Sequence, residues 1–172
     1  MTIIDVASGA ARVLARTRLG SNGQVAWTPG NSVAYIGAEN RAFHLVDPDT
    51  EEEIPLDAPE RGWMGYPEPS LTRGLAVWWN RSPEKGSGIW LLGAGPPQVI
   101  SEGPFRPCGW TPDGNGIYYA RGDRSLWLHR EGEDVRVGGL DDLPLSTSAD
   151  GRTLLVARMD RQSDIWLAEG DW

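Results

Sequence analysis

Three similar strand-forming segments recur at nearly equal intervals along the second half of the chain. Each centres on a tryptophan flanked by aliphatic residues: "GIWLL" at Trp90, "SLWLH" at Trp127 and "DIWLA" at Trp166. These tryptophans lie 37 and 39 residues apart. Recurrence with a period of about 40 residues is typical of folds that stack small supersecondary units. The repeat therefore limits the fold more than any other feature.

The third copy shows most clearly how one repeat divides into strands. Four segments, "RPCGW", "GIYYAR", "SLWLHR" and "DVRVGG", are named strands A to D. Pro112 at the second turn position and Asp113-Gly114 after it predict a type I turn between A and B. In strand C, Leu126 and Leu128 face one side and Trp127 the other. A strand that is apolar on both faces is expected in the middle of stacked sheets.

An earlier and weaker copy, "VAWTPGNSVAYIGAENRAFHLVD", places Phe43 in line with Trp90. Four-stranded units of this length predict an all-β chain with the β-propeller fold, built from about four antiparallel blades plus an N-terminal half blade. The expected limits are 1–20 for the half blade, then 21–58, 66–103, 104–139 and 143–172. A β-sandwich is the alternative, but a sandwich does not require the same sequence to recur. Nine tryptophans, against two phenylalanines, suit repeated sites where a large ring fills a wedge between layers.

Two stretches, "WTPDGNGIYYARGDRSLWL" and "SADGRTLLVARMDRQSDIWLAEG", resemble the TolB-type, WD-like propeller repeat. The matching positions are Trp110, Pro112, Asp113, Gly114, Asp150, Gly151, Asp164, Ile165 and Trp166. The second copy departs from this pattern, since "EPSLTRG" has no Asp-Gly turn. The resemblance implies a bacterial propeller, but this repeat serves many unrelated functions.

The ends of the chain leave two arrangements open. Residues 2–16 are expected to form strands C and D of a preceding blade, and the last copy has no strand D. Either residues 12–16 complete the last blade in a ring of four, or the chain is the C-terminal part of a larger ring. We favour the larger ring, because uncovered blade faces and open edges promote aggregation.

Composition excludes several classes of partner. The formal net charge of −8 argues against nucleic acid and anionic membranes, which bind clustered Lys and Arg. No run approaches the length of a membrane span, and residues 1–16 lack the basic start and apolar stretch typical of a signal peptide, so we expect any export signal to lie outside this chain. Its compartment is therefore open: periplasmic or extracytoplasmic if an upstream region carries a signal or anchor, and cytoplasmic otherwise. The single cysteine, Cys108, cannot form an internal disulfide.

No motif identifies a catalytic, cofactor-binding or metal-binding residue. His44 and His129 fall in strand C of different copies, without a second His or a Cys nearby in sequence. The chain has no Gly-x-Ser-x-Gly elbow. The acidic run over residues 47–53 lacks the pattern of a calcium loop and is expected to be a solvated hairpin. We therefore expect no cofactor.

The candidate binding residues lie in the loops where propellers commonly hold partners. The longest connection between blades carries Arg61, Trp63, Met64 and Tyr66, and the loops between strands B and C carry Arg81, Lys85, Arg121, Asp123, Arg124 and Arg161. Aromatic and basic groups of this kind suit a contact hot spot.

These residues predict a non-enzymatic scaffold that recognises a protein, a peptide or a glycan. The alternatives are part of a propeller hydrolase or polysaccharide lyase, and a regulatory domain fused to a serine/threonine kinase or a winged-helix regulator. The last alternative comes from a resemblance of the "SDIWLAEG" ending to propellers fused behind such modules.

Overall fold

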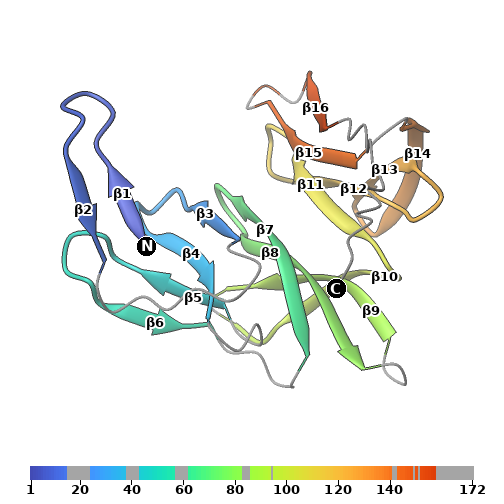
Figure 1. Ribbon diagram of the computed structural model, residues 1–172. Coiled ribbons are helices and arrows are strands. Elements are labelled where there is room, and N and C mark those ends of the chain that lie inside the picture. Colours follow the sequence, from blue (N-terminus) through green and yellow to red (C-terminus); the bar gives the residue numbers. More distant parts are fainter. Residues whose placement is uncertain are drawn as a thin grey trace, which may run out of the picture.

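The computed structural model describes residues 1–14, 24–37, 43–56, 62–82, 86–93, 95–140, 143–148, 150 and 152–157. All regular secondary structure in these ranges is β-strand, which confirms the all-β class. The strands form five antiparallel sheets that follow one another in chain order, from β1–β2 in blue to β15–β16 in red (Figure 1). Three of these sheets have four strands each.

Each four-stranded sheet is a meander in which successive strands pair. The first contains β3 (Val25–Trp27), β4 (Val33–Ile36), β5 (Phe43–Val46) and β6 (Glu53–Pro55). The second contains β7 (Trp63–Ser70), β8 (Gly74–Ser82), β9 (Gly86–Leu92) and β10 (Gln98–Glu102). The third contains β11 (Arg106–Trp110), β12 (Gly116–Ala120), β13 (Ser125–Arg130) and β14 (Glu133–Gly139). Two-stranded sheets flank them: β1 (Thr2–Ile4) with β2 (Ala11–Val13), and β15 (Leu143–Thr147) with β16 (Leu154–Ala157).

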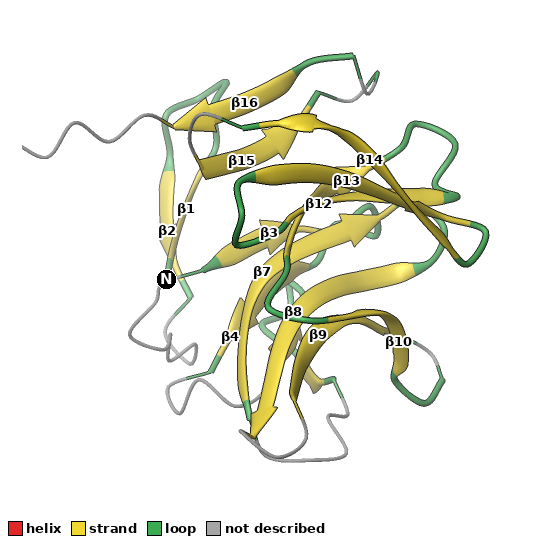
Figure 2. Cartoon of the chain, turned by 90° about the vertical axis from the view of Figure 1, so that its right-hand side faces the viewer, coloured by secondary structure: helices red, strands yellow, loops and turns green. Residues whose placement is uncertain are grey.

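The hydrophobic cores lie between neighbouring sheets. One core joins β1–β2 to the first four-stranded sheet through Leu14, Val33, Tyr35 and Val46. A second joins the first and second sheets through Ala34, Ile36, Phe43, Met64, Leu75, Val77, Trp79 and Leu92. A third joins the second and third sheets through Ala76, Ile89, Ile117 and Tyr119. Figure 2 shows β12–β14 next to β8–β10, the arrangement that this third core requires.

The strand registers identify which residue of each sheet is equivalent to the repeated tryptophan. Trp127 pairs with Tyr119 and Trp90 pairs with Val77. The equivalent residue in the first sheet is His44, which pairs with Tyr35 and stacks on its ring at 5.2 Å between centroids. The alignment of Phe43 with Trp90 is therefore wrong by one residue. Phe43 points to the opposite side of its sheet and is fully buried in the second core.

A hydroxyl residue closes the turn between the first two strands of every sheet from β3 onward. Thr111 accepts a hydrogen bond from the Gly116 amide at 2.8 Å and donates one to Asp113 at 2.6 Å. The second sheet lacks the Asp-Gly pair, yet Ser70 accepts from the Thr72 and Arg73 amides. The other two turns use Thr28 and Ser148 in the same way. The hydroxyl thus recurs where the sequence motif is lost.

Replacing Trp79 by Ala should destabilise the stack of sheets. Trp79 is fully buried and meets the Trp90 ring edge-on at 5.1 Å. Loss of a buried aromatic ring leaves a cavity that lowers the free energy of unfolding by about 3–5 kcal/mol. Urea denaturation measures this change. Val137→Ala, on the exposed strand β14, serves as the control and should change stability by less than about 1 kcal/mol. Equal effects of both variants would contradict the central place of the second core.

Candidate interaction site

The strand directions give the stack two distinct ends. The turn face carries the hairpin turns β3–β4, β7–β8 and β11–β12. The loop face carries the β12–β13 connection, residues 121–124, and the starting residues of strands β3, β7 and β11. These first strands of successive sheets contact one another, so residues at their starts are brought together on the loop face.

Tyr66 lies at a β-bulge near the start of β7. Tyr66 and Pro67 together oppose a single residue of β8, because the register shifts between Gly65 and Glu68. The φ angle of Tyr66 is 54°, in the left-handed region that is costly for a bulky residue. A hydrogen bond from the Tyr66 amide to Gln24 Oε1, at 2.5 Å, holds this conformation from the neighbouring sheet. The bulge re-aims the tyrosine side chain away from regular strand alternation.

Two further side chains surround the Tyr66 ring. The guanidinium of Arg106, the first residue of β11, lies 4.8 Å from the ring centroid. Trp78 meets the same ring edge-on at 6.3 Å. Arg106 is exposed, and no carboxylate of the described residues lies within ion-pair distance of it. Trp63, at the start of β7, is 56% exposed. The group Trp63, Tyr66 and Arg106 is called the mouth cluster.

The placement of Trp63 and Tyr66 differs from the sequence prediction in one respect. Both residues belong to strand β7 and not to the connection before it. The Gly-Tyr-Pro segment has turn-like residues, but pairing with β8 continues on both sides of the bulge. Sequence reasoning missed Arg106 and Gln24 altogether. The only available signal was that "RPCGW" is a first strand, whose opening residue shares an end with the connections between blades.

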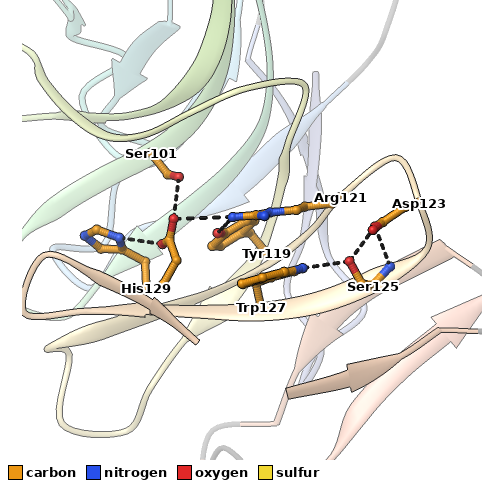
Figure 3. Close-up of polar contacts among 8 residues, drawn as sticks. Ser101, Tyr119, Arg121, Asp123, Ser125, Trp127 and His129 are labelled. Carbon is orange, nitrogen blue, oxygen red and sulfur yellow. Dashed lines mark hydrogen bonds and ion pairs between the residues drawn. The ribbon is translucent and has the colours of Figure 1, made fainter. Parts of the chain in front are cut away.

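Arg121 is in the predicted loop, but its side chain turns into the crevice between the second and third sheets (Figure 3). Its guanidinium stacks 3.6 Å from the Trp127 ring centroid, with the Phe105 ring at 4.8 Å. It donates hydrogen bonds to the Tyr119 hydroxyl at 2.9 Å and to Asp134 at 3.4 Å. This arginine therefore joins strands β12, β13 and β14 of the third sheet to Phe105, in the connection from the second sheet.

The same carboxylate organises the rest of the crevice. Asp134 receives a hydrogen bond from Ser101 of β10 at 3.3 Å and contacts His129 Nδ1 at 2.8 Å (Figure 3). Ser101 bonds to the aspartate and not to the imidazole, so these residues do not have the order of a Ser-His-Asp triad. The network joins the outer strands of two sheets through one shared acid.

Asp123, the acidic residue among the candidates, forms its hydrogen bonds inside its own loop. Its carboxylate accepts hydrogen bonds from the Ser125 amide and hydroxyl, and Ser125 accepts one from Trp127 Nε1 at 2.6 Å. The Ser125 hydroxyl is the main cause that lowers the pKa of Asp123. Asp123 thus holds in place, through Ser125, the Trp127 indole on which the Arg121 guanidinium stacks.

The remaining candidates are less defined by the structure. Arg124 follows in the same loop with a φ of 61° and an exposed side chain. Arg81 belongs to the end of strand β8 and not to a loop, and its side chain is outside the described part. Arg61, Lys85 and Arg161 lie outside the described residues. Whether any of the candidates contacts a partner stays a prediction.

A largely buried acid on β7 lies near Cys108 of β11, where the second and third sheets meet. Burial raises the pKa of Glu68, on β7, to about 8. Burial, together with the charge of Glu68, raises the pKa of the Cys108 thiol to about 12. The Cys108 thiol also donates a hydrogen bond to the Arg106 carbonyl at 3.3 Å. At neutral pH both groups are mainly protonated, so this part of the interior carries little charge.

The described residues offer neither a metal centre nor a membrane-crossing helix. No group of three or more His, Cys, Asp or Glu there could hold a metal ion. No helix in the described ranges is long and apolar enough to cross a bilayer.

The stacked four-stranded sheets define the chain as a β-propeller protein with a TolB-like fold, as the sequence predicts. Among solved structures, the fold matches TolB from Acinetobacter baumannii with a TM-score of 0.66 and 20% sequence identity. The match covers 94% of this chain and 43% of the TolB chain, so the chain spans less than half of that protein's length. No protein-family model and no curated protein matches the sequence. The alternative of a β-sandwich is excluded, and at this identity the similarity concerns the fold alone.

Replacing Arg121 by Ala should destabilise the joint between the second and third sheets by about 1–3 kcal/mol, because it removes the stack on Trp127 and one partner of Asp134. Arg121→Lys should recover only part of the loss, since an ammonium cannot reproduce the planar contact. Thermal unfolding of both variants measures the effect, with Arg152→Ala, at an exposed position before β16, as the control. A fully stable Arg121→Ala variant would show that the network does not hold the sheets.

Glu68 should make stability depend on pH. Its pKa is raised from an ordinary value of 4.5 to about 8, so the folded protein keeps a proton that the unfolded chain has lost. Stability is therefore full below about pH 4.5 and falls as the pH rises toward 8, by up to about 1.4 kcal/mol per unit. Glu68→Gln should remove this slope in denaturation curves at successive pH values. Glu133→Gln, on the exposed strand β14, should leave it unchanged. A slope that persists in Glu68→Gln would assign the titration to another group.

Proposed function

We propose that this chain is a non-enzymatic recognition module that binds a protein or peptide partner at the mouth cluster. The observation that carries the proposal is the exposed Arg106 guanidinium on the face of Tyr66, which belongs to the same strand, β7, as the exposed Trp63. Trp, Tyr and Arg are the residues that dominate binding energy at protein interfaces. They project here from strands, which hold side chains more rigidly than loops do.

The charge of the cluster favours an acidic peptide as the ligand. Arg106 has no carboxylate partner in the described part of the chain, while Arg121 is already paired with Asp134. An Asp or Glu side chain, or a terminal carboxylate, would satisfy the Arg106 guanidinium with charge-assisted hydrogen bonds. The fold supports a role as an interaction scaffold in general terms, because propellers offer rigid supports for loops and inner strands.

A displayed peptide library selected on the wild-type chain tests this proposal. The selected peptides should be rich in Asp and Glu, and calorimetry should show binding at least about tenfold weaker to Arg106→Ala and to Trp63→Ala. Val137→Ala, which removes an exposed apolar side chain from β14, should bind as the wild type does. Selected peptides that bind both mouth-cluster variants normally would remove this surface from the site.

A further inference from the structure

An apolar cavity opens on the turn face, between the first and second four-stranded sheets. Its volume is about 210 Å³, and it is lined by Thr28, Pro29, Gly30, Leu45, Leu56, Ser70, Leu71, Gly74, Leu75, Leu92 and Gly93. The two hydroxyl residues of the wall are already bonded within their own turns. The space therefore offers leucine side chains and few free polar groups. A ligand that fills it must be apolar.

The next pair of sheets shows what fills the corresponding space. Trp110 pairs with Ile117 directly before the turn hydroxyl, and its indole crosses to the second sheet, where Nε1 donates to the Glu68 carbonyl at 2.8 Å. In the second sheet, the equivalent position is Pro69, which pairs with Leu75. Ser70, which follows Pro69, and Leu75, which pairs with it, both line the cavity. The cavity thus lies where one sheet of the stack lacks an indole.

Leu71 marks the opening of the cavity. It follows the turn hydroxyl, and the equivalent residues in the first and third sheets are Pro29 and Pro112. Leu71 is 76% exposed. The β7–β8 turn, which borders the cavity from the second sheet, therefore presents a large aliphatic side chain to solvent. An exposed apolar side chain at the rim of an apolar cavity is typical of a pocket that binds a side chain of a partner.

The charge near the cavity indicates which residues should flank an apolar side chain that binds in it. Leu45, in the wall, lies two residues before the acidic β5–β6 turn, which contains Asp47, Asp49, Glu51 and Glu52. Hydrogen bonds from the Asp49 and Thr50 amides lower the pKa of Asp47, so this carboxylate stays ionised. Arg12 forms an ion pair with Asp49 and also acts electrostatically on Asp47, while no ion pair among the described residues involves Glu51 or Glu52. The turn is therefore complementary to a basic segment.

We propose that this cavity binds a tryptophan side chain of a protein partner, from a segment in which Lys or Arg flanks the tryptophan. The indole enters between the sheets as Trp110 does in the next interface, and the basic neighbours meet the β5–β6 turn. This site is on the opposite face from the mouth cluster. It does not rest on the function proposed above, and the two predicted ligands have opposite charge.

Three capped tripeptides test the proposal: Lys-Trp-Lys, Lys-Ala-Lys and Glu-Trp-Glu. Backbone amide shifts of Leu71, Gly74 and Gly93, followed by NMR during titration, report binding at the cavity. Lys-Trp-Lys should bind at least about tenfold more tightly than either of the other peptides, and added salt should weaken it. Equal binding of Lys-Trp-Lys and Lys-Ala-Lys, or no shift at these amides, would overturn the proposal.

A matched pair of glycine variants separates the cavity from the rest of the surface. A side chain added at Gly30, in the wall, or at Gly138, on β14, meets no atom within 4 Å of its Cβ, and neither glycine needs a positive φ. Gly30→Trp should fill the cavity and abolish the shifts caused by Lys-Trp-Lys, while Gly138→Trp should leave them intact. Unchanged binding to Gly30→Trp would contradict the site. A wild-type dimer that Gly30→Trp abolishes would make a second copy the occupant, and would also contradict it.

Discussion

The packing of one apolar sheet face on the next is the interaction on which every other feature of this structure depends. Strand β4 shows how one short sequence serves two cores: Val33 and Tyr35 face the β1–β2 hairpin, whereas Ala34 and Ile36 face the second sheet. Strand β8 repeats the arrangement, with Val77 and Ala76 entering different cores. A sheet with two apolar faces cannot be stable alone, so each blade exists only through its neighbours.

Polar contacts around the residues equivalent to the repeated tryptophan add to this apolar packing between sheets. Trp127 carries the Arg121 guanidinium, and the third sheet thereby reaches Ser101 of the second through Asp134. In the first sheet His44 replaces the tryptophan, stacks on Tyr35 and contacts Glu53 at 2.5 Å. The two arrangements share a flat ring in the strand and a carboxylate from the last strand of the same sheet. This position in the repeat therefore keeps the same structural role, although the residues that fill it differ.

The sequence predicted those parts of the fold that depend on local chemistry. The "TPDG" turn and the alternation around Trp127 follow from neighbouring residues, and both are present in the structure. His44 was missed because only the register shows that an imidazole can occupy the place of an indole. Tyr66 was assigned to a loop because its bulge is held by Gln24, 42 residues away in the chain. The direction of Arg121 depends on Phe105, which lies in the connection from the second sheet. Such contacts between sheets have no signal in the local sequence.

The first strands show where a repeated backbone gains individual chemistry. β7, β11 and β15 each have a register shift near the same height, at Tyr66-Pro67, at Cys108 and between Pro144 and Ser146. A bulge leaves one residue free of the ladder and increases local twist, so its side chain is released from the alternation that packing imposes. The two bulge residues use this freedom differently, since Tyr66 lies against the exposed Arg106 while Cys108 is fully buried. A tyrosine and a cysteine therefore stand at comparable points of β7 and β11 without disturbing the stack. This freedom lets one fold carry different side chains at the same point of its first strands, and it allows the Tyr66 ring to lie against the Arg106 guanidinium.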